Sequence, residues 1–221
     1  MGQEQGAVPR RGRFVVLEGI DGCGKTTQRQ ALADWLPHSG LMPPGVALQL
    51  TREPGGSPLG VALRELLLHP PGEQVPCPEA ELLLYAADRA QHVRQRILPA
   101  LEAGHWVLCD RFSGSTAAYQ GYGRGLPLDM ILALERIATA GLTANLTLWL
   151  DLPLEESLRR RGHRPADRIE AAGEAFLARV REGFAQLAAE RSWCRIEAAA
   201  PPEEVSRACR RALQERFGGD G

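Results

Sequence analysis

The chain of 221 residues is almost without lysine. Lys and Arg together number 26 against 27 Asp and Glu, which gives a formal net charge of −1, and the sole lysine is Lys25. A near-neutral chain does not bind nucleic acids or membrane surfaces through bulk charge, so a site for anions must come from the local placement of basic side chains. The segment around Lys25 is therefore the first to examine.

Aromatic residues, long apolar runs and paired cysteines are also scarce. At 5% aromatic content, the core must be built mainly from Leu, Ala and Val. No segment reaches the roughly 18 consecutive apolar residues of a membrane helix, and the first residues lack the apolar core of a signal peptide. The five cysteines contain no C-x-x-C pair. This pattern argues against a disulfide framework or a zinc site and favours a reducing, cytoplasmic compartment.

Short apolar segments alternate with longer helical patterns along the chain. The alternation predicts an α/β fold in which helices cover both faces of a five-stranded parallel sheet. We expect one domain over residues 13–217, between disordered tails at 1–12 and 218–221. The expected strands lie near 14–17, 46–50, 106–109, 146–150 and 194–196, and the expected helices near 25–36, 58–68, 79–103, 127–140, 171–190 and 202–217.

Residues 19–26, Gly-Ile-Asp-Gly-Cys-Gly-Lys-Thr, match the phosphate-binding pattern G-x-x-x-x-G-K-[ST]. Glycines let consecutive backbone N–H groups turn toward a phosphate, and the following helix presents its positive N-terminus. We expect Lys25 to reach the β- and γ-phosphates of a nucleoside triphosphate and the Thr26 hydroxyl to bind Mg²⁺. A glycine-rich turn with a solvated lysine is the alternative. The expected nucleotide-binding residues are Gly19, Ile20, Asp21, Gly22, Cys23, Gly24, Lys25, Thr26 and Thr27.

The third expected strand ends in Asp110-Arg111. Strand ends at one edge of an α/β sheet are where ligands bind. A carboxylate there suits Mg²⁺ or its waters, and the adjacent guanidinium suits a second phosphate; a local ion pair that closes a loop is the alternative. The chain has no N-K-x-D guanine-reading motif, which disfavours a GTPase. The expected metal ligands are therefore Thr26 and Asp110.

Several further segments carry a family resemblance. They are Asp21 within the phosphate loop, T-R-E-P-G-G at 51–56, Y-A-A-D-R-A-Q at 85–91, D-R-F at 110–112, A-Y-Q-G at 118–121 and D-R-I-E at 167–170. In this order, over about residues 13–217, they resemble the bacterial thymidylate kinases. The resemblance implies a P-loop kinase fold with a mobile lid. It also implies an enzyme that transfers the γ-phosphate of ATP to dTMP, with Mg²⁺, giving dTDP and ADP for dTTP synthesis.

The same resemblance assigns the acceptor site. It places Arg52 and Arg111 on the dTMP phosphate, because planar guanidinium groups grip phosphate oxygens bidentately. It places Asp21 near the deoxyribose 3′-hydroxyl and the metal, the Tyr85 ring on thymine, and Arg89 on a base oxygen. The nucleoside pocket is completed by Ser115, Thr116, Tyr119 and Gln120, and the Tyr119 ring would exclude a ribose 2′-hydroxyl.

A basic segment follows the fourth expected strand. Residues 157–168 hold five arginines against one acid, and Gly162 and Pro165 interrupt any helix there. A flexible basic loop suits a lid that closes over ATP; a solvated basic face is the alternative. Some members of the resembled family carry an arginine in the phosphate loop where this chain has Gly22, so the resemblance implies that the lid supplies the catalytic arginine. The pattern leaves open which one does so, and the candidates are Arg159, Arg160, Arg161 and Arg164.

The remaining choices concern the acceptor, the class of protein and the oligomeric state. The expected catalytic residues are Lys25, Asp21, Arg111 and the lid arginines. A kinase for another nucleoside monophosphate or for a deoxynucleoside is the alternative with the same fold, although Arg52 and Arg111 favour an acceptor that already carries a phosphate. A nucleotide-binding regulatory protein is a further alternative. The resemblance implies a homodimer, with no nucleic-acid or membrane partner. An apolar stripe within 79–98 is compatible with a dimer or with ordinary core, and its members are Leu82, Leu83, Ala86, Ala90, Val93 and Ile97.

Overall fold

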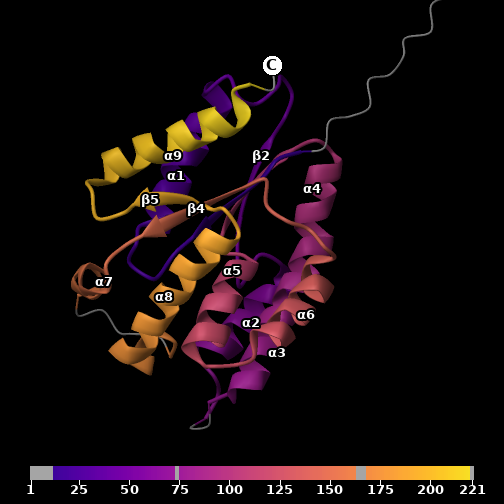
Figure 1. Cartoon of the computed structure of the whole chain (residues 1–221). Coiled ribbons are helices and arrows are strands. Elements are labelled where there is room, and N and C mark those ends of the chain that lie inside the picture. Colours follow the sequence, from indigo (N-terminus) through magenta and orange to yellow (C-terminus); the bar gives the residue numbers. More distant parts are fainter. Residues whose placement is uncertain (1–11, 73–74, 163–167, 220–221) are drawn as a thin grey trace, which may run out of the picture.

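A computed structural model describes residues 12–72, 75–162 and 168–219 of the chain. At its centre lies a sheet of five parallel strands in the order β2-β3-β1-β4-β5, which confirms the predicted α/β class (Figure 1). The strands are β1 (Phe14–Glu18), β2 (Leu48–Arg52), β3 (Trp106–Asp110), β4 (Leu146–Asp151) and β5 (Cys194–Glu197). Of the described residues, no helix is both long enough and apolar enough to cross a membrane.

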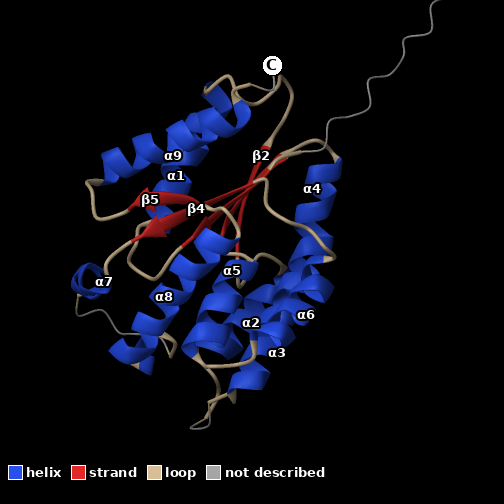
Figure 2. Ribbon diagram, in the orientation of Figure 1, coloured by secondary structure: helices blue, strands red, loops and turns tan. Residues whose placement is uncertain are grey.

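Helices lie on both faces of the sheet (Figure 2). One face carries α1 (Lys25–Trp35) and α9 (Pro202–Phe217). The other side holds α2 (Pro58–Leu68), α3 (Pro78–His92), α4 (Leu98–Glu102), α5 (Ser113–Thr116), α6 (Leu128–Thr139) and α8 (Glu174–Glu190). Helix α7 (Leu154–Arg161) follows β4, and the shorter turns are η1 (Leu36–His38), η2 (Val93–Ile97), η3 (Ala117–Gly123) and η4 (Glu170–Ala172).

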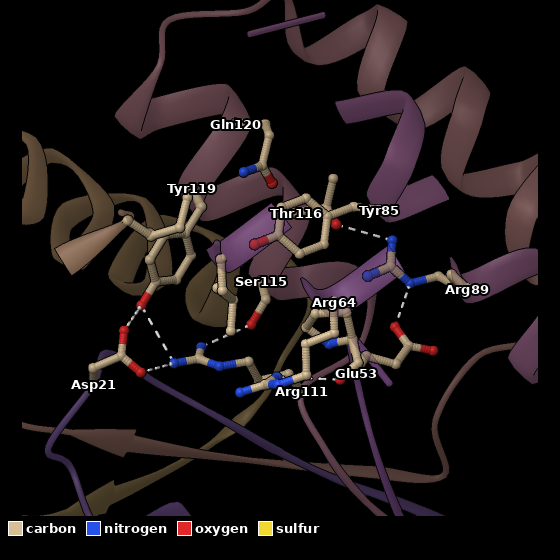
Figure 3. A pocket seen from close by; sticks show the side chains of 13 residues that line it. Asp21, Glu53, Arg64, Tyr85, Arg89, Arg111, Ser115, Thr116, Tyr119 and Gln120 are labelled. Carbon is tan, nitrogen blue, oxygen red and sulfur yellow. Dashed lines mark hydrogen bonds and ion pairs between the residues drawn. The ribbon is translucent and has the colours of Figure 1, made fainter. Parts of the chain in front are cut away.

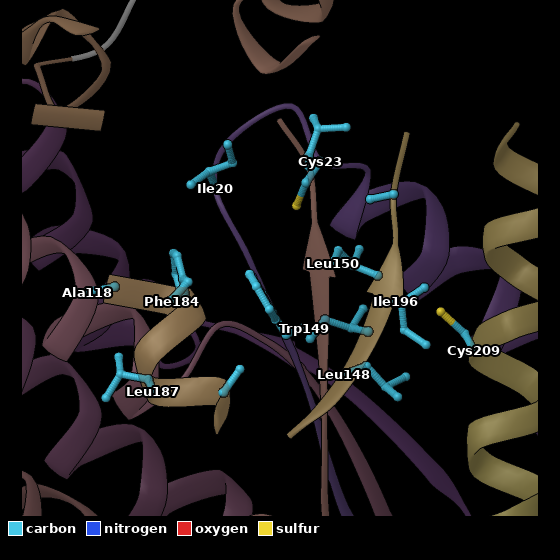
Figure 4. Close-up of a cluster of buried hydrophobic side chains, with 14 of the residues drawn as sticks. Ile20, Cys23, Ala118, Leu148, Trp149, Leu150, Phe184, Leu187, Ile196 and Cys209 are labelled. Atoms are coloured by element: carbon cyan, nitrogen blue, oxygen red, sulfur yellow. The ribbon is translucent and has the colours of Figure 1, made fainter. Parts of the chain in front are cut away.

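The largest hydrophobic cluster holds the two sides together through β4 and β5 (Figure 4). Leu148 and Leu150 of β4 are fully buried, because a parallel strand covered on both faces has no solvent side. Phe184 of α8 packs on one side of these strands and Cys209 of α9 on the other. This packing fixes β4 beside β1, so the loops that follow both strands share one edge of the sheet.

The order of the strands in the sheet creates a crevice at that edge, where a ligand can bind. Strand β1 lies between β3 and β4, and the register pairs Leu17 with Asp110 and Glu18 with Trp149. The chain leaves β1 toward α1 on one face and leaves β3 toward α5 on the other. Such a switch point opens a crevice at the carboxyl ends of the strands. The phosphate loop and the Asp110-Arg111 pair therefore meet there.

Several expected elements differ from the observed ones. The helix expected at 79–103 is divided into α3, η2 and α4, and helices α5, η3 and α7 were not expected. Leu83 was expected on an apolar face, but its side chain is 56% exposed. The basic segment expected as a loop over 157–168 begins as the last turns of α7. Acidic residues in the first turn of α7 and arginines in the last complement the helix dipole and explain why it forms. The predicted tails lie largely outside the described residues.

Candidate active site

The phosphate loop runs from the end of β1 to the start of α1. Gly22 and Gly24 both adopt positive φ, at 79° and 95°, a conformation that costs other residues about 1–2 kcal/mol. Gly24 precedes Lys25 directly, so the left-handed turn delivers the chain into the first turn of α1. The backbone N–H groups at this helix start have no helical partner and are suited to anions.

The Lys25 side chain is enclosed by the loop. Lys25 is only 7% exposed, and its ammonium group donates to the carbonyl oxygens of Gly19 and Ile20, each at 2.9 Å. The Cys23 thiol lies 3.5 Å from the same nitrogen. Burial raises the pKa of the Cys23 thiol, so the thiol stays neutral and acts as a small filler. The compact Lys25 ammonium group is thus enclosed by backbone atoms of the phosphate loop.

An ion pair joins the phosphate loop to the turn after β3 (Figure 3). Arg111 donates from Nη2 to Asp21 Oδ1 at 2.6 Å and from Nη1 to the Gly19 carbonyl at 2.9 Å. The Tyr119 hydroxyl donates to the other Asp21 oxygen at 2.9 Å. Burial alone would raise the pKa of Asp21, but the charges of Arg111 and Lys25 hold it well below its usual range. Asp21 is therefore a fixed negative charge between two cations.

A pocket opens beside this ion pair (Figure 3). Eight of the nine residues predicted to bind the acceptor or to act beside it, Asp21 included, line this pocket; the remaining lining comes from the TREPGG loop, from α2 and from the residue before η4. The lining residues are Asp21, Glu53, Pro54, Arg64, Leu68, Tyr85, Arg89, Arg111, Ser115, Thr116, Tyr119, Gln120 and Ile169.

Arg89 reaches this pocket from α3 and is held on several sides. Its Nε donates to Glu53 at 2.7 Å, one terminal nitrogen to the Thr116 hydroxyl at 2.9 Å and the other to the Phe112 carbonyl at 3.0 Å. His92, one turn later on α3, lies 2.8 Å from the other Glu53 oxygen. The guanidinium plane is therefore fixed before any ligand arrives, and little further ordering is needed to bind one.

Glu81 organises the far end of the pocket. This buried carboxylate accepts from the Gln120 amide at 2.7 Å and pairs with Arg124 at 3.1 Å and with Arg168 at 2.6 Å. Burial would raise the pKa of Glu81, but the hydrogen bonds from Arg124 and Gln120 lower it. The Gln120 amide is oriented by these contacts, and the chain that returns at Arg168 is attached to α3.

The pocket is lined by Arg64, which no motif indicated, and not by Arg52, which the resemblance placed on the acceptor phosphate. Arg52 ends β2 with an exposed side chain and does not line the described pocket, whereas Arg64 of α2 does. The two arginines flank Gly55, since a Cβ at that position would lie 3.3 Å from Arg64 Cδ and 3.8 Å from Arg52 Nε. Arg64 was missed because it lies outside every motif. Glu53 was missed as well, although it lies within T-R-E-P-G-G; this motif is the signal that could have identified it.

Helix α7 contacts the phosphate loop directly. The Ser157 hydroxyl donates to the Asp21 carbonyl at 2.6 Å. A Cβ at Gly22 would lie 3.1 Å from the Ser157 carbonyl oxygen and 3.5 Å from Arg161 Cγ. Arg161 therefore runs beside the loop where Gly22 leaves room for it. Arg159 and Arg160 instead pair with Glu156, each at 2.7 Å, and Arg164 lies outside the described residues.

The predicted metal ligands offer only oxygen. Within the described ranges no group of three or more His, Cys, Asp and Glu side chains forms a metal site of its own. Mg²⁺ is commonly bound by one or two protein oxygens, substrate phosphates and water, without such a cage. The Thr26 hydroxyl at the start of α1 and the Asp110 carboxylate at the end of β3 are oxygen donors of the kind that this mode of binding uses, and both follow strands that end at the same edge of the sheet.

The parallel sheet and the phosphate loop after its central strand, with the arginine-lined pocket beside them, define a P-loop nucleotide kinase. The comparisons are more specific. A family model described as thymidylate kinase matches residues 17–209. Curated thymidylate kinases are similar over most of their lengths: 71% identical in Synechococcus sp. (strain WH7803), covering 92% of this chain and 96% of the relative, and 67% identical in Prochlorococcus marinus (strain MIT 9313), covering 94% and 96%. The chain belongs to the thymidylate kinase family, which confirms the predicted enzyme class and its dTMP acceptor.

Asp88 gives the site a pH-dependent stability. One carboxyl oxygen accepts from the Gly55 N–H at 3.0 Å, while the other is buried without a hydrogen-bond partner among the described residues. Burial and the charge of Glu53 raise the pKa of Asp88 from 3.8 to about 6. The native state thus favours the protonated acid, and this stabilisation is lost as the pH rises through about 6.

Asp88→Asn is expected to stabilise the protein at pH 8 by up to about 3 kcal/mol, because the amide keeps the contact to Gly55 without a buried charge. At pH 4 the two proteins should differ little. Urea unfolding at pH 4, 6 and 8 measures this, with the exposed Asp34→Asn as the matched control. A difference between wild type and Asp88→Asn that does not change with pH would contradict the assignment.

Lys25→Arg is expected to lower kcat by at least about 10²-fold, although it keeps the charge. The space that holds the ammonium between two carbonyls does not fit a planar guanidinium. Steady-state kinetics on the folded variant, compared with Lys25→Met, tests this. If charge alone mattered, Lys25→Arg would retain a rate near wild type while Lys25→Met lost activity.

Proposed function

We propose that the protein transfers the γ-phosphate of ATP to dTMP with the aid of Mg²⁺, giving dTDP and ADP for dTTP synthesis. The observation that carries the proposal is the Asp21–Arg111 ion pair. It lies between the phosphate loop on one side and the pocket on the other, where donor and acceptor phosphates must meet. Phosphoryl transfer needs positioning and positive charge more than covalent chemistry from the protein.

The acceptor end of the pocket supports a substrate that already carries a phosphate. Arg111 and Arg64 both line it, and Arg52 lies beside Arg64 across Gly55. Guanidinium groups bind phosphate oxygens bidentately and remain charged at every physiological pH. We assign the dTMP phosphate to Arg111 and Arg64, with Arg52 adding charge from the rim.

The opposite end of the pocket supports a pyrimidine base. Tyr85 and Arg89 are four residues apart on α3 and both line the pocket, so an aromatic face and a fixed donor meet the same ligand. Thr116 and Gln120 supply polar groups on the far wall. We assign thymine to this end, with its ring on Tyr85 and a carbonyl oxygen on Arg89.

Tyr119 supports selection of a deoxyribose. Its hydroxyl is fixed by Asp21, and its ring packs against Phe176 and Phe184 with centroids 6.2 and 6.0 Å away. A ring held at both ends cannot move aside for an added hydroxyl. We propose that Tyr119 excludes the ribose 2′-hydroxyl and that Ser115 completes the sugar site.

The donor side uses the phosphate loop. Gly19, Ile20, Asp21, Gly22, Cys23, Gly24 and Thr27 are assigned to ATP together with Lys25, whose ammonium would exchange the loop carbonyls for phosphate oxygens. Thr26 and Asp110 are assigned to Mg²⁺, which when bound neutralises phosphate charge. The protein's part is to hold these oxygens at the edge of β1 and β3, where the two strands are paired.

Arg161 is our choice for the arginine that the lid contributes. It lies beside Gly22, and its Nε is buried without a hydrogen-bond partner in the described part of the chain. Arg159 and Arg160 are engaged by Glu156. We propose that residues 157–168 act as a lid over ATP, with α7 as its attached end.

Homodimer formation is supported by apolar side chains that face solvent on α3 and on α2 and α6, the two helices that pack against α3. Large hydrophobic residues are exposed on each of them: Leu59, Val61, Leu66, Leu83, Leu132 and Ile137. Large apolar side chains exposed on neighbouring helices are typical of a protein interface. We propose that two copies pair through it. A cytoplasmic location is proposed as well, and the five free thiols support it.

The acceptor assignment is tested by an ADP-release assay with dTMP, dUMP, AMP, GMP, CMP and thymidine. We expect dTMP to give the highest kcat/KM and thymidine almost none, because thymidine brings no phosphate to Arg111. Higher turnover with AMP or CMP than with dTMP would overturn the assignment.

Arg161→Ala is expected to lower kcat by at least about 10²-fold, the typical cost of removing one group that stabilises transferring charge. The KM for dTMP should change little, because Arg161 lies on the ATP side. Parallel kinetics on Arg159→Ala and Arg164→Ala provide the comparison. If either of those variants loses more activity than Arg161→Ala, the lid arginine has been assigned to the wrong residue.

A further inference from the structure

Glu18, the last residue of β1, is buried directly behind the ion pair. Its side chain is 1% exposed, yet its carboxylate is fully engaged. One oxygen accepts the backbone N–H groups of Phe112 and Ser115, each at 3.0 Å, and the other accepts the Ser115 hydroxyl at 2.6 Å. All three donors belong to the turn that follows β3, so a single carboxylate holds that turn against the end of β1.

The turn needs such support because its backbone is strained. Arg111 has a φ of 70°, in the left-handed region that non-glycine residues rarely occupy. Its N–H donates to the Leu17 carbonyl at 2.9 Å. Gly114, in the same turn, has no room for a side chain: a Cβ there would lie 2.9 Å from a Glu18 oxygen and closer still to the Trp193 ring. The turn is therefore packed directly onto Glu18.

Ser115 carries this support to the guanidinium. Because its hydroxyl hydrogen points to Glu18, its oxygen lone pairs face away from Glu18, and Arg111 Nη1 donates to that oxygen at 3.0 Å. The same Arg111 pairs with Asp21 at 2.6 Å. A continuous chain of charge-assisted hydrogen bonds thus runs from Glu18 through Ser115 and Arg111 to the phosphate loop.

We propose that Glu18 is a positioning residue for phosphoryl transfer, which acts through the Ser115 hydroxyl to set the place and orientation of the Arg111 guanidinium. Glu18 is not among the residues that line the pocket, so it would act on a bound substrate only through Ser115 and Arg111. The inference rests on the proposed function, in which Arg111 carries the transferring charge. It adds a residue that lies outside every site predicted from the motifs.

Glu18→Gln is the direct test. The amide oxygen can still accept the two backbone N–H groups, but the amide nitrogen donates to the Ser115 oxygen and turns the hydroxyl hydrogen toward Arg111. We expect kcat with dTMP to fall about 10- to 100-fold at pH 8, in line with the loss of a charged orienting group, while the KM for ATP stays within about 2-fold. A wild-type kcat would overturn the proposal.

A double-mutant cycle separates positioning from a general loss of structure. In a Ser115→Ala background the relay is already broken, so Glu18→Gln should lower kcat by less than about 3-fold more. Fully additive losses would show that Glu18 acts by another route and would overturn the proposal. If Glu18→Gln does not fold, Ser115→Ala decides alone: a wild-type kcat in that variant also overturns the relay.

Asp151→Asn is the matched control. Asp151 ends β4 as Glu18 ends β1, is 3% exposed, and pairs with Arg181 and Arg195 instead of with residues of the pocket. Its variant should lose thermal stability and keep the wild-type kcat, whereas Glu18→Gln should lose kcat at temperatures well below its Tm. Failure of the proposed function itself would be distinguishable, because the wild-type protein would then show no dTMP-dependent release of ADP.

Discussion

The site depends on one ion pair, between Asp21 in the phosphate loop and Arg111 in the turn after β3. These residues are 90 positions apart in the chain, and only the strand order brings them together, because β1 and β3 are neighbours in the sheet. The pair joins the phosphate loop to the wall of the pocket. In the function that we propose, it keeps a cation at the point where the two polyanionic substrates would repel each other. Moving either strand by one residue would separate the two charges and divide the site in two.

The arginines at the two ends of the pocket are each held by one carboxylate and one hydroxyl group. Arg111 is held by Asp21 and Ser115, and Arg89 is held by Glu53 and Thr116. Each guanidinium has a rigid fork of donors, so a carboxylate on one side leaves the other donors in known directions. Lysine has no such fork. Where a cation must fit among backbone carbonyls, as in the phosphate loop, its compact ammonium is the better choice. The chain accordingly keeps a single lysine and uses arginine elsewhere.

The sequence predicted the strands and the motif residues, but not the contacts between them. Apolar runs located each strand within about two residues; β2 was displaced because pairing with β3, and not hydrophobicity, sets its ends. The family resemblance carried by the motifs indicated most of the residues that line the pocket. Glu18 and His92 were missed for a physical reason: each acts through residues far away in the chain, and no local period marks such a partner. Glu18 and Ser115, for example, are 97 positions apart. Arg64 was missed because it lies outside every motif. Helix α7 was missed because arginines that end a helix look the same in sequence as arginines in a loop.

The near-zero net charge of the chain is consistent with this pairing of arginines and acids. Arg111, Arg89 and Arg124, three arginines in or beside the pocket, pair with the carboxylates of Asp21, Glu53 and Glu81, which the fold has buried or half-buried. Burying an unpaired guanidinium or carboxylate would be strongly unfavourable, whereas a paired one is tolerated. The acids therefore allow cations to be placed in a dehydrated pocket without unfolding it. Their second effect is orientation, since each accepts hydrogen bonds that leave the remaining donors directed at the ligand. Replacing such an acid by its amide should accordingly cost catalysis more than charge balance alone would indicate.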